Sequence, residues 1–148
     1  MEIPQSGLST PERLRAFLRR QAENAGRARD DASAALWLRL ALALEPDDGA
    51  LWLDLGWHLR ALGKERPALR ALARAARRLP WENGAAEYQA ALILVETGET
   101  RAALAALRIA VRREPALAWD AVTEEAFASA LLGEPAFEEM RRVARGAP

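Results

Sequence analysis

Prolines and glycines recur along the chain at an interval close to 35 residues. The prolines that keep this interval lie 33 to 35 residues apart and are Pro46, Pro80, Pro115 and Pro148. The glycines that keep it are Gly63, Gly98 and Gly133. Glycine commonly ends a helix in the left-handed conformation, and proline often follows a helix because it cannot continue one. Each interval therefore predicts two helices joined by a tight turn.

The residues between these breakers favour helices over strands. Alanine and leucine dominate, whereas Ile, Val and Thr are sparse. Eight helices are predicted, at 10–25, 31–44, 48–62, 66–79, 84–97, 100–113, 118–131 and 135–145. Ser9 and Glu12 have the spacing of a capping box at the start of the first. Hairpins of such helices cannot bury their apolar faces alone, so we expect an all-α, right-handed solenoid of about four stacked hairpins.

Length and charge limit the class of protein. The chain has 148 residues, 51% of them hydrophobic, which is enough for one domain with a continuous core. We expect an N-terminal segment at 1–9 and a single domain at 10–148, with repeats at about 15–48, 49–82, 84–117 and 118–148. The 21 basic and 21 acidic residues balance, which disfavours a globally basic nucleic-acid binder.

The sequence lacks the features expected of a metal site, a membrane span or an N-terminal targeting signal. The chain has no cysteine and one histidine, so we expect no metal site built from thiolates or several imidazoles. The longest apolar stretch, at 32–44, is too short to span a membrane and contains Arg39. The N-terminus lacks a basic start followed by an apolar run. A cytoplasmic protein without a membrane span is expected.

The second interval carries the residues of a repeat signature. In order, these residues are Trp52, Leu55, Gly56, Leu59, Gly63, Ala68, Leu72, Ala75 and Pro80. This pattern resembles the tetratricopeptide repeat (TPR) family nearly position by position, with Leu59 where the family usually has tyrosine. The third interval is looser, because Glu87 replaces the tryptophan, and the first and fourth are degenerate. The resemblance implies that the first helix of each hairpin lines a concave groove and the second forms the convex back.

Groups for catalysis are few. His58 lies beside the core residue Leu59, so we interpret it as a residue of a helix–helix seam rather than a catalytic base. The adjacent carboxylate pairs diverge by about 100° on a helix and cannot share a proton. The glycines end helices and form no phosphate-binding loop. We therefore expect a protein that is not an enzyme and uses neither a cofactor nor a metal.

The positions that the resemblance places in the groove are acidic and partly apolar. They are Leu53, Asp54, Trp57, Arg60, Tyr88, Gln89, Leu92, Val95, Glu96 and Phe127. Trp57 follows Trp52 by five residues, about 140° around a helix, so both rings cannot face the same core. Some TPR proteins hold the carboxyl terminus of a chaperone with lysine, arginine and asparagine, but the corresponding residues here are Arg19, Glu23, Asp54, Ala85 and Gln89. That clamp is therefore not expected.

Two functions follow from these faces. The first is a non-enzymatic protein–protein interaction module, an adaptor, scaffold or assembly chaperone that binds an amphipathic or basic peptide, as TPR chaperones of bacterial secretion systems do. The groove residues could instead pack on the chain's own N-terminal segment or a second protomer. The other function is a nucleic-acid or anionic-membrane binder that uses the arginines of the convex face, although nucleic acid is disfavoured because no aromatic residues lie among them.

The C-terminal hairpin is a predicted contact between two copies. Pro148 holds the closing proline position of the fourth repeat, so we expect no capping helix after it, and terminal repeats lack one neighbour. We expect Phe137, Val143, Trp119 and Phe127 to leave apolar surface uncovered there, which would support a homodimer.

Overall fold

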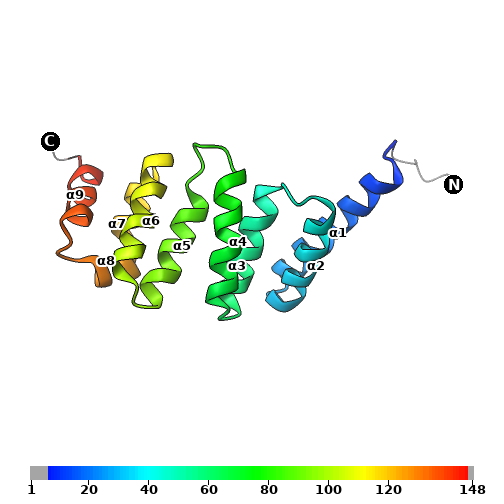
Figure 1. Cartoon of the computed structure of the whole chain (residues 1–148), viewed down its shortest axis with the longest axis horizontal. Coiled ribbons are helices and arrows are strands. Elements are labelled where there is room, and N and C mark those ends of the chain that lie inside the picture. The colour runs from blue at the N-terminus through cyan, green and yellow to red at the C-terminus, as the bar shows by residue number, and fades with distance from the viewer. Residues whose placement is uncertain (1–6, 147–148) are drawn as a thin grey trace.

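The computed structural model describes residues 7–146, whose secondary structure is entirely helical. Their helices are α1 (Thr10–Arg27), α2 (Asp31–Leu44), α3 (Gly49–Ala61), α4 (Glu65–Arg78), α5 (Ala85–Glu96), α6 (Thr100–Arg113), α7 (Leu117–Thr123), α8 (Glu125–Leu131) and α9 (Pro135–Ala144). They follow one another along an elongated molecule, with α1 at one end and α9 at the other (Figure 1). The predicted all-α architecture of stacked hairpins is confirmed. Within these residues, no helix combines the length and hydropathy needed to cross a membrane.

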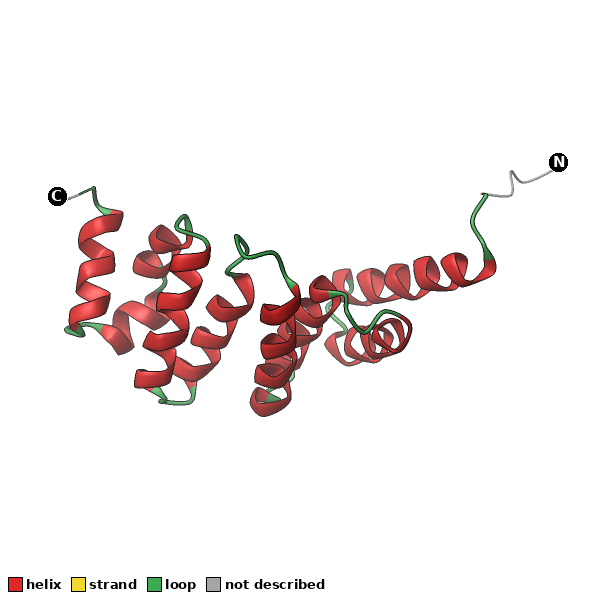
Figure 2. Ribbon diagram, turned by 45° about the horizontal axis from the view of Figure 1, so that its top comes forward, coloured by secondary structure: helices red, strands yellow, loops and turns green. Residues whose placement is uncertain are grey.

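The tight turns have the backbone conformation that the glycine spacing predicts. Gly63, Gly98 and Gly133 have φ values of 71°, 79° and 87°, in the left-handed region that glycine adopts without a steric cost. Arg29 takes the corresponding place between α1 and α2, with a φ of 58°. At the start of α1, the Ser9 backbone N–H donates to the Glu12 carboxylate over 2.6 Å, which confirms the capping box. The turns join α1 to α2, α3 to α4 and α5 to α6 as antiparallel hairpins (Figure 2).

The predicted helix at 118–131 is wrong, because the chain forms two short helices there. Glu124 has φ −71° and ψ 119°, an extended conformation that ends α7 and begins α8 in a new direction. The change of direction carries Phe127 and Leu131 into the core, where both are fully buried. A straight helix would instead have kept Glu125, which is exposed, in the apolar position of the repeat. Burial of two large side chains therefore favours the break.

Two apolar clusters make the core. Leucines of α1 to α4 form one, into which Ile93 of α5 also packs. Phe127, Leu131, Phe137 and Leu107 form the centre of the other, under α5 to α9. Phe127 and Phe137 were expected to leave apolar surface at the C-terminal end, and this expectation is wrong because both are buried. Trp119 and Val143 are exposed there.

Gly56 permits the close approach of α3 and α4. A Cβ atom added at position 56 would lie 2.6 Å from Cδ2 and 2.7 Å from Cγ of the buried Leu72, and 3.5 Å from the carbonyl oxygen of Ala68. The side chain that lies against Gly56 is therefore mainly that of Leu72. The glycine lies inside a helix, where it costs about 1 kcal/mol relative to alanine, so the contact has to offset that cost.

We expect Gly56→Leu to destabilise the protein by about 1–3 kcal/mol, because the larger side chain overpacks the hairpin. Gly56→Ala should lose less, since better helix propensity offsets part of the displacement of Leu72. Urea unfolding followed by circular dichroism measures both. A leucine variant as stable as the wild type would contradict the packing of α3 on Leu72.

Candidate functional site

Two adjoining hollows lie between the first helices of the first two hairpins. One, of about 250 Å³, is lined by Arg19, Ala22, Glu23, Gly26, Leu38, Ala50, Leu51, Asp54 and His58. The other, of about 410 Å³, is lined by Gly26, Arg29, Asp31, Trp57, His58, Arg60, Ala61 and Glu96. They share Gly26 and His58, so we treat them as one surface and call it the α1–α3 groove. Its residues come mainly from α1, α3 and the C-terminal end of α5. Arg29 of the α1–α2 turn and Asp31 and Leu38 of α2 complete it.

His58 closes the seam beneath this groove. Its Nδ1 atom lies 2.7 Å from Oδ1 of Asp31, and the imidazole is largely buried. Gly26 of α1 lies against the ring, since a Cβ atom there would be 3.4 Å from Cε1 of His58, an ordinary contact distance. The interpretation of His58 as a seam residue is confirmed. Among residues 7–146, no group of three His, Cys, Asp or Glu side chains is placed to hold a metal ion.

Arg19 is not free to bind a ligand carboxylate. Its guanidinium donates to Glu45 over 2.8 Å and also to Asp48, at the turn between α2 and α3. The Asp48 carboxylate in turn accepts from the backbone N–H of Leu51, which caps α3. Arg19 therefore stabilises the junction of the first two hairpins. Both carboxylates that its guanidinium binds belong to this chain, so Arg19 is not available as part of a clamp for a ligand carboxylate.

Asp54 is the unpaired acid of the groove. Within the described part of the chain, it forms no hydrogen bond or ion pair. The residue as a whole is exposed, but neighbouring groups shield its carboxyl from water, and this desolvation raises its pKa. Asp48 and Glu23 raise the pKa further, whereas His58 and Arg19 act in the opposite direction. A cation bound here would stabilise the charged form of Asp54.

Trp57 is the large apolar residue of the groove, with 51% of its surface exposed. Beside it, Arg60 donates from Nε to Glu96 over 3.3 Å and from Nη1 to Gln89 over 3.4 Å, so these side chains link α3 to α5. The positive charge of Arg60 is thereby offset by Glu96. Because Glu96 is paired with Arg60, the groove carries less net negative charge than its sequence predicts, and most of that charge is on Asp54.

Tyr88 marks the C-terminal continuation of this face. Its ring packs edge-on against Phe127, with centroids 5.4 Å apart, and the residue is half-buried. Desolvation raises the pKa of Tyr88 to about 12, and the nearby carboxylates of Glu124 and Asp120 contribute to the rise. The hydroxyl therefore stays neutral at physiological pH and faces an acidic neighbourhood.

Two predicted groove residues belong to the core. Phe127 has no exposed surface and Leu92 has 6%, so neither can contact a ligand directly. Both pack in the C-terminal cluster. Leu53 and Val95 are half-buried at the edge of the two clusters. The remaining predicted residues of this set lie at or next to the α1–α3 groove or continue it along α5.

Arg113 and Glu87, which stands in the tryptophan position of the third repeat, form a buried ion pair that was not predicted from the sequence. Arg113 is 6% exposed and is ion-paired with Glu87. It also donates to the backbone carbonyls of Ala76, Pro80 and Trp81 over 2.9–3.0 Å. The pair therefore ties α4 and the following loop to α5 and α6. One signal for it was present in the sequence: a carboxylate in the tryptophan position of a repeat needs a buried cation.

Several solved structures share this architecture. A Thermobaculum terrenum O-GlcNAc transferase mutant superposes with a TM-score of 0.69 and 20% identity over 84% of this chain, which spans only 23% of that protein's length. The TPR2B domain of yeast Sti1, solved with pHsp70, gives 0.64 and 15%, covering 89% of this chain and 94% of that one. The Yersinia enterocolitica type III secretion chaperone SycD, solved with a peptide of the translocator YopD, gives 0.62 and 19%, covering 95% and 92%.

These likenesses establish the fold. The chain has the tetratricopeptide-repeat fold, as the signature in the second interval predicts. A scan against protein-family models and a search of curated proteins find no match.

Proposed function

We propose that this chain is a protein–protein interaction module that holds an amphipathic, basic peptide segment in the α1–α3 groove. The observation that carries the proposal is the half-exposed Trp57 ring in the same groove as the unpaired carboxylate of Asp54. Large aromatic residues that lack a core position commonly anchor interfaces. A desolvated carboxylate without a partner gains most from a cation that approaches it.

The chemistry of the groove supports binding rather than a reaction. His58 is engaged with Asp31, and the other polar residues are paired or lie on exposed helix faces. Two proteins of the same fold were solved with partners, the Sti1 domain with pHsp70 and SycD with a peptide of YopD. An apolar anchor beside an acidic group suits one face of a helix that carries leucines and lysines. The module would act as an adaptor or assembly chaperone without catalysis.

The test uses a labelled amphipathic peptide of about 15 residues, the length at which an isolated helix becomes marginally stable. Its leucines and lysines are placed at helical spacing. We expect Trp57→Ala to weaken binding at least about tenfold, as loss of a central aromatic anchor does. Trp81→Ala serves as a matched control, because that ring is also exposed but lies outside the groove. Fluorescence anisotropy measures the affinities, and thermal melts verify that both variants fold.

Asp54 gives the second arm of this test. Asp54→Asn should weaken binding of the lysine peptide but not of a matched peptide with glutamine in place of lysine. Because the pKa of Asp54 is raised, its charge is lost at a higher pH than that of an ordinary aspartate. As the pH is lowered, binding of the lysine peptide to the wild type should therefore begin to weaken at a higher pH than it would with an ordinary aspartate. Binding to Asp54→Asn should not show this pH dependence. Equal binding to the wild type and Trp57→Ala would contradict the site.

A further inference from the structure

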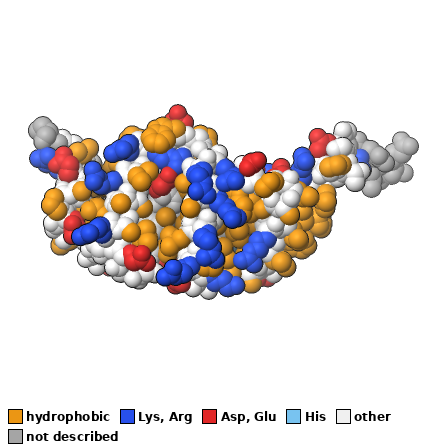
Figure 3. Space-filling model, in the orientation of Figure 1, with side chains coloured by type: hydrophobic (Ala, Val, Ile, Leu, Met, Phe, Trp, Pro, Cys, Tyr) orange, Lys and Arg blue, Asp and Glu red, His pale blue; other side chains and the backbone are white. Residues whose placement is uncertain are grey.

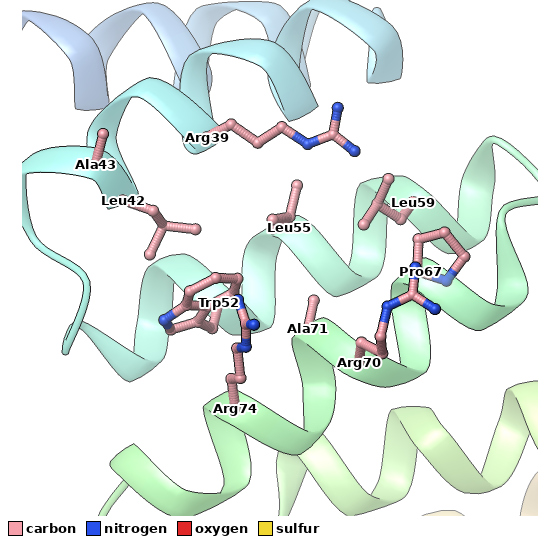
Figure 4. A pocket seen from close by; sticks show the side chains of 10 residues that line it. All are labelled: Arg39, Leu42, Ala43, Trp52, Leu55, Leu59, Pro67, Arg70, Ala71 and Arg74. Carbon is pink, nitrogen blue, oxygen red and sulfur yellow. The ribbon is translucent and has the colours of Figure 1, made fainter.

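A second hollow, on the opposite side of α3, has a different chemistry from the groove. It is a slot of about 390 Å³ between α2 and α4, the second helices of the first two hairpins, and we call it the α2–α4 slot. Its floor and walls are formed by apolar side chains, which include Leu42, Trp52, Leu55, Leu59, Pro67 and Ala71. Its volume lies within the range of roughly 300–1,000 Å³ that is usual for ligand pockets. Figure 4 shows these side chains converging from three helices.

Three arginines border this apolar slot. Arg39 reaches in from α2, and Arg70 and Arg74 come from α4 on the other side (Figure 4). All three residues are exposed, and within residues 7–146 none of them forms an ion pair. No carboxylate lines the slot. In the space-filling view, basic side chains gather over the middle of the molecule beside apolar surface (Figure 3). The slot is thus electropositive at its rim and apolar inside.

The combination of rim and floor identifies the chemistry of an occupant. Guanidinium groups that have no carboxylate partner within the protein can bind those of a ligand through paired, charge-assisted hydrogen bonds. The floor has no charged group and takes a large apolar side chain. A peptide segment with carboxylates on both sides of an apolar residue satisfies both regions at once. Arg78, which is also on α4 but outside the slot, is instead ion-paired with Asp47 over 3.3 Å.

Nucleic acid and membrane fit the slot less well. Base stacking needs an open aromatic face, but the Trp52 ring is covered by the guanidinium of Arg74, 4.6 Å from its centroid. The Trp52 Nε1–H is also occupied, because it donates to the carbonyl of Pro46 over 2.7 Å. A bilayer would meet the arginines at the rim, while the apolar side chains lie inside the slot. These contacts favour a peptide over both.

We propose that the α2–α4 slot is a second docking site, which takes an acidic peptide segment. One large apolar side chain of that segment rests on Leu55 and Ala71, and its carboxylates pair with Arg39, Arg70 and Arg74. This site lies on the other side of α3 from the α1–α3 groove and selects the opposite charge. The protein would therefore be able to hold two different segments at the same time, and the proposal does not depend on the function of the groove.

The probe is a fluorescein-labelled synthetic peptide with one phenylalanine flanked by glutamates. Two matched peptides replace the glutamates with glutamine or the phenylalanine with serine. The protein variant is Arg39→Gln with Arg70→Gln, and the control is Arg101→Gln with Arg108→Gln. The control removes the same charge from exposed positions of α6, outside the slot. Circular dichroism verifies the fold of each variant.

We expect the slot variant to bind the acidic peptide at least about tenfold more weakly than the wild type, and the control variant to bind within about twofold. Each matched peptide should also bind at least about tenfold more weakly to the wild type. Equal losses in the slot and control variants would mean non-specific attraction and would overturn the proposal. Stronger binding of poly(U) RNA or phosphatidylserine vesicles than of the peptide, lost in the slot variant, would overturn the choice of a peptide.

Discussion

Replacing Arg113 with methionine is expected to destabilise the protein by about 3–5 kcal/mol. The guanidinium is buried, and it is the ion-pair partner of Glu87. Methionine preserves much of the apolar stem but leaves the carboxylate of Glu87 buried without a cation. The backbone carbonyls that accept from Arg113 lose their donor as well, and an unsatisfied buried polar group costs about 1–3 kcal/mol. Urea unfolding at neutral pH measures the loss.

The neighbouring residue provides the control. Arg112 is exposed on the same helix, so Arg112→Met should change the free energy of unfolding by no more than about 0.5 kcal/mol. Adding Glu87→Leu to Arg113→Met should restore part of the lost stability, because the uncompensated buried charge is then removed. If Arg113→Met were as stable as Arg112→Met, the ion pair would not be buried in solution.

The expected loss at Arg113 has a consequence for the whole solenoid. Stacked repeats contact mainly their neighbours, so the stability of the array depends on the interfaces between them. Arg113 lies at the end of α6 in the third repeat, yet it donates to carbonyls at the end of α4 and in the loop after it, in the second. Weakening this link should lower the cooperativity of unfolding between the N-terminal and C-terminal halves of the core.

The hairpin pattern was predictable from the sequence because its signals are local. Gly63, Gly98 and Gly133 each form the left-handed turn that their positions indicate, and proline follows where a helix has ended. The interruption at Glu124 has no such signal, since the segment 118–131 contains neither proline nor glycine. The break follows from tertiary contacts instead, because it brings Phe127 under Tyr88. Local propensity does not contain this information.

The candidate site was predictable only in part, for a related reason. Helical spacing assigns a residue to a face, and it correctly separated Trp57 from the core. It does not reveal which charges are already paired: Arg19 is held by Glu45, and Arg60 by Glu96. Helical spacing also does not reveal that the helices after α5 cover Leu92 and bury it. Sequence spacing therefore identified the surface, whereas pairing and burial decide which residues remain available for a ligand.

Phe127 and Trp57 give opposite expectations that separate core from groove. Phe127→Ala should cost about 3–5 kcal/mol, because a fully buried aromatic side chain is removed and the space it leaves cannot close completely. The edge-on contact with Tyr88 is lost as well. Trp57→Ala should change stability by no more than about 0.5 kcal/mol, since half of its ring is exposed and the residue lies in a groove. Thermal and urea unfolding measure both variants.

A conservative variant distinguishes lost packing from a disturbed break between α7 and α8. Phe127→Leu keeps an apolar side chain in the core and should be markedly more stable than Phe127→Ala, because it leaves a smaller cavity. If both variants were equally unstable, the aromatic ring itself would be needed for α8 to dock on α5. A large loss in Trp57→Ala with none in Phe127→Ala would reverse the assignment of the two residues. The groove would then lack its anchor, because only an exposed ring can be both dispensable for folding and essential for holding a peptide.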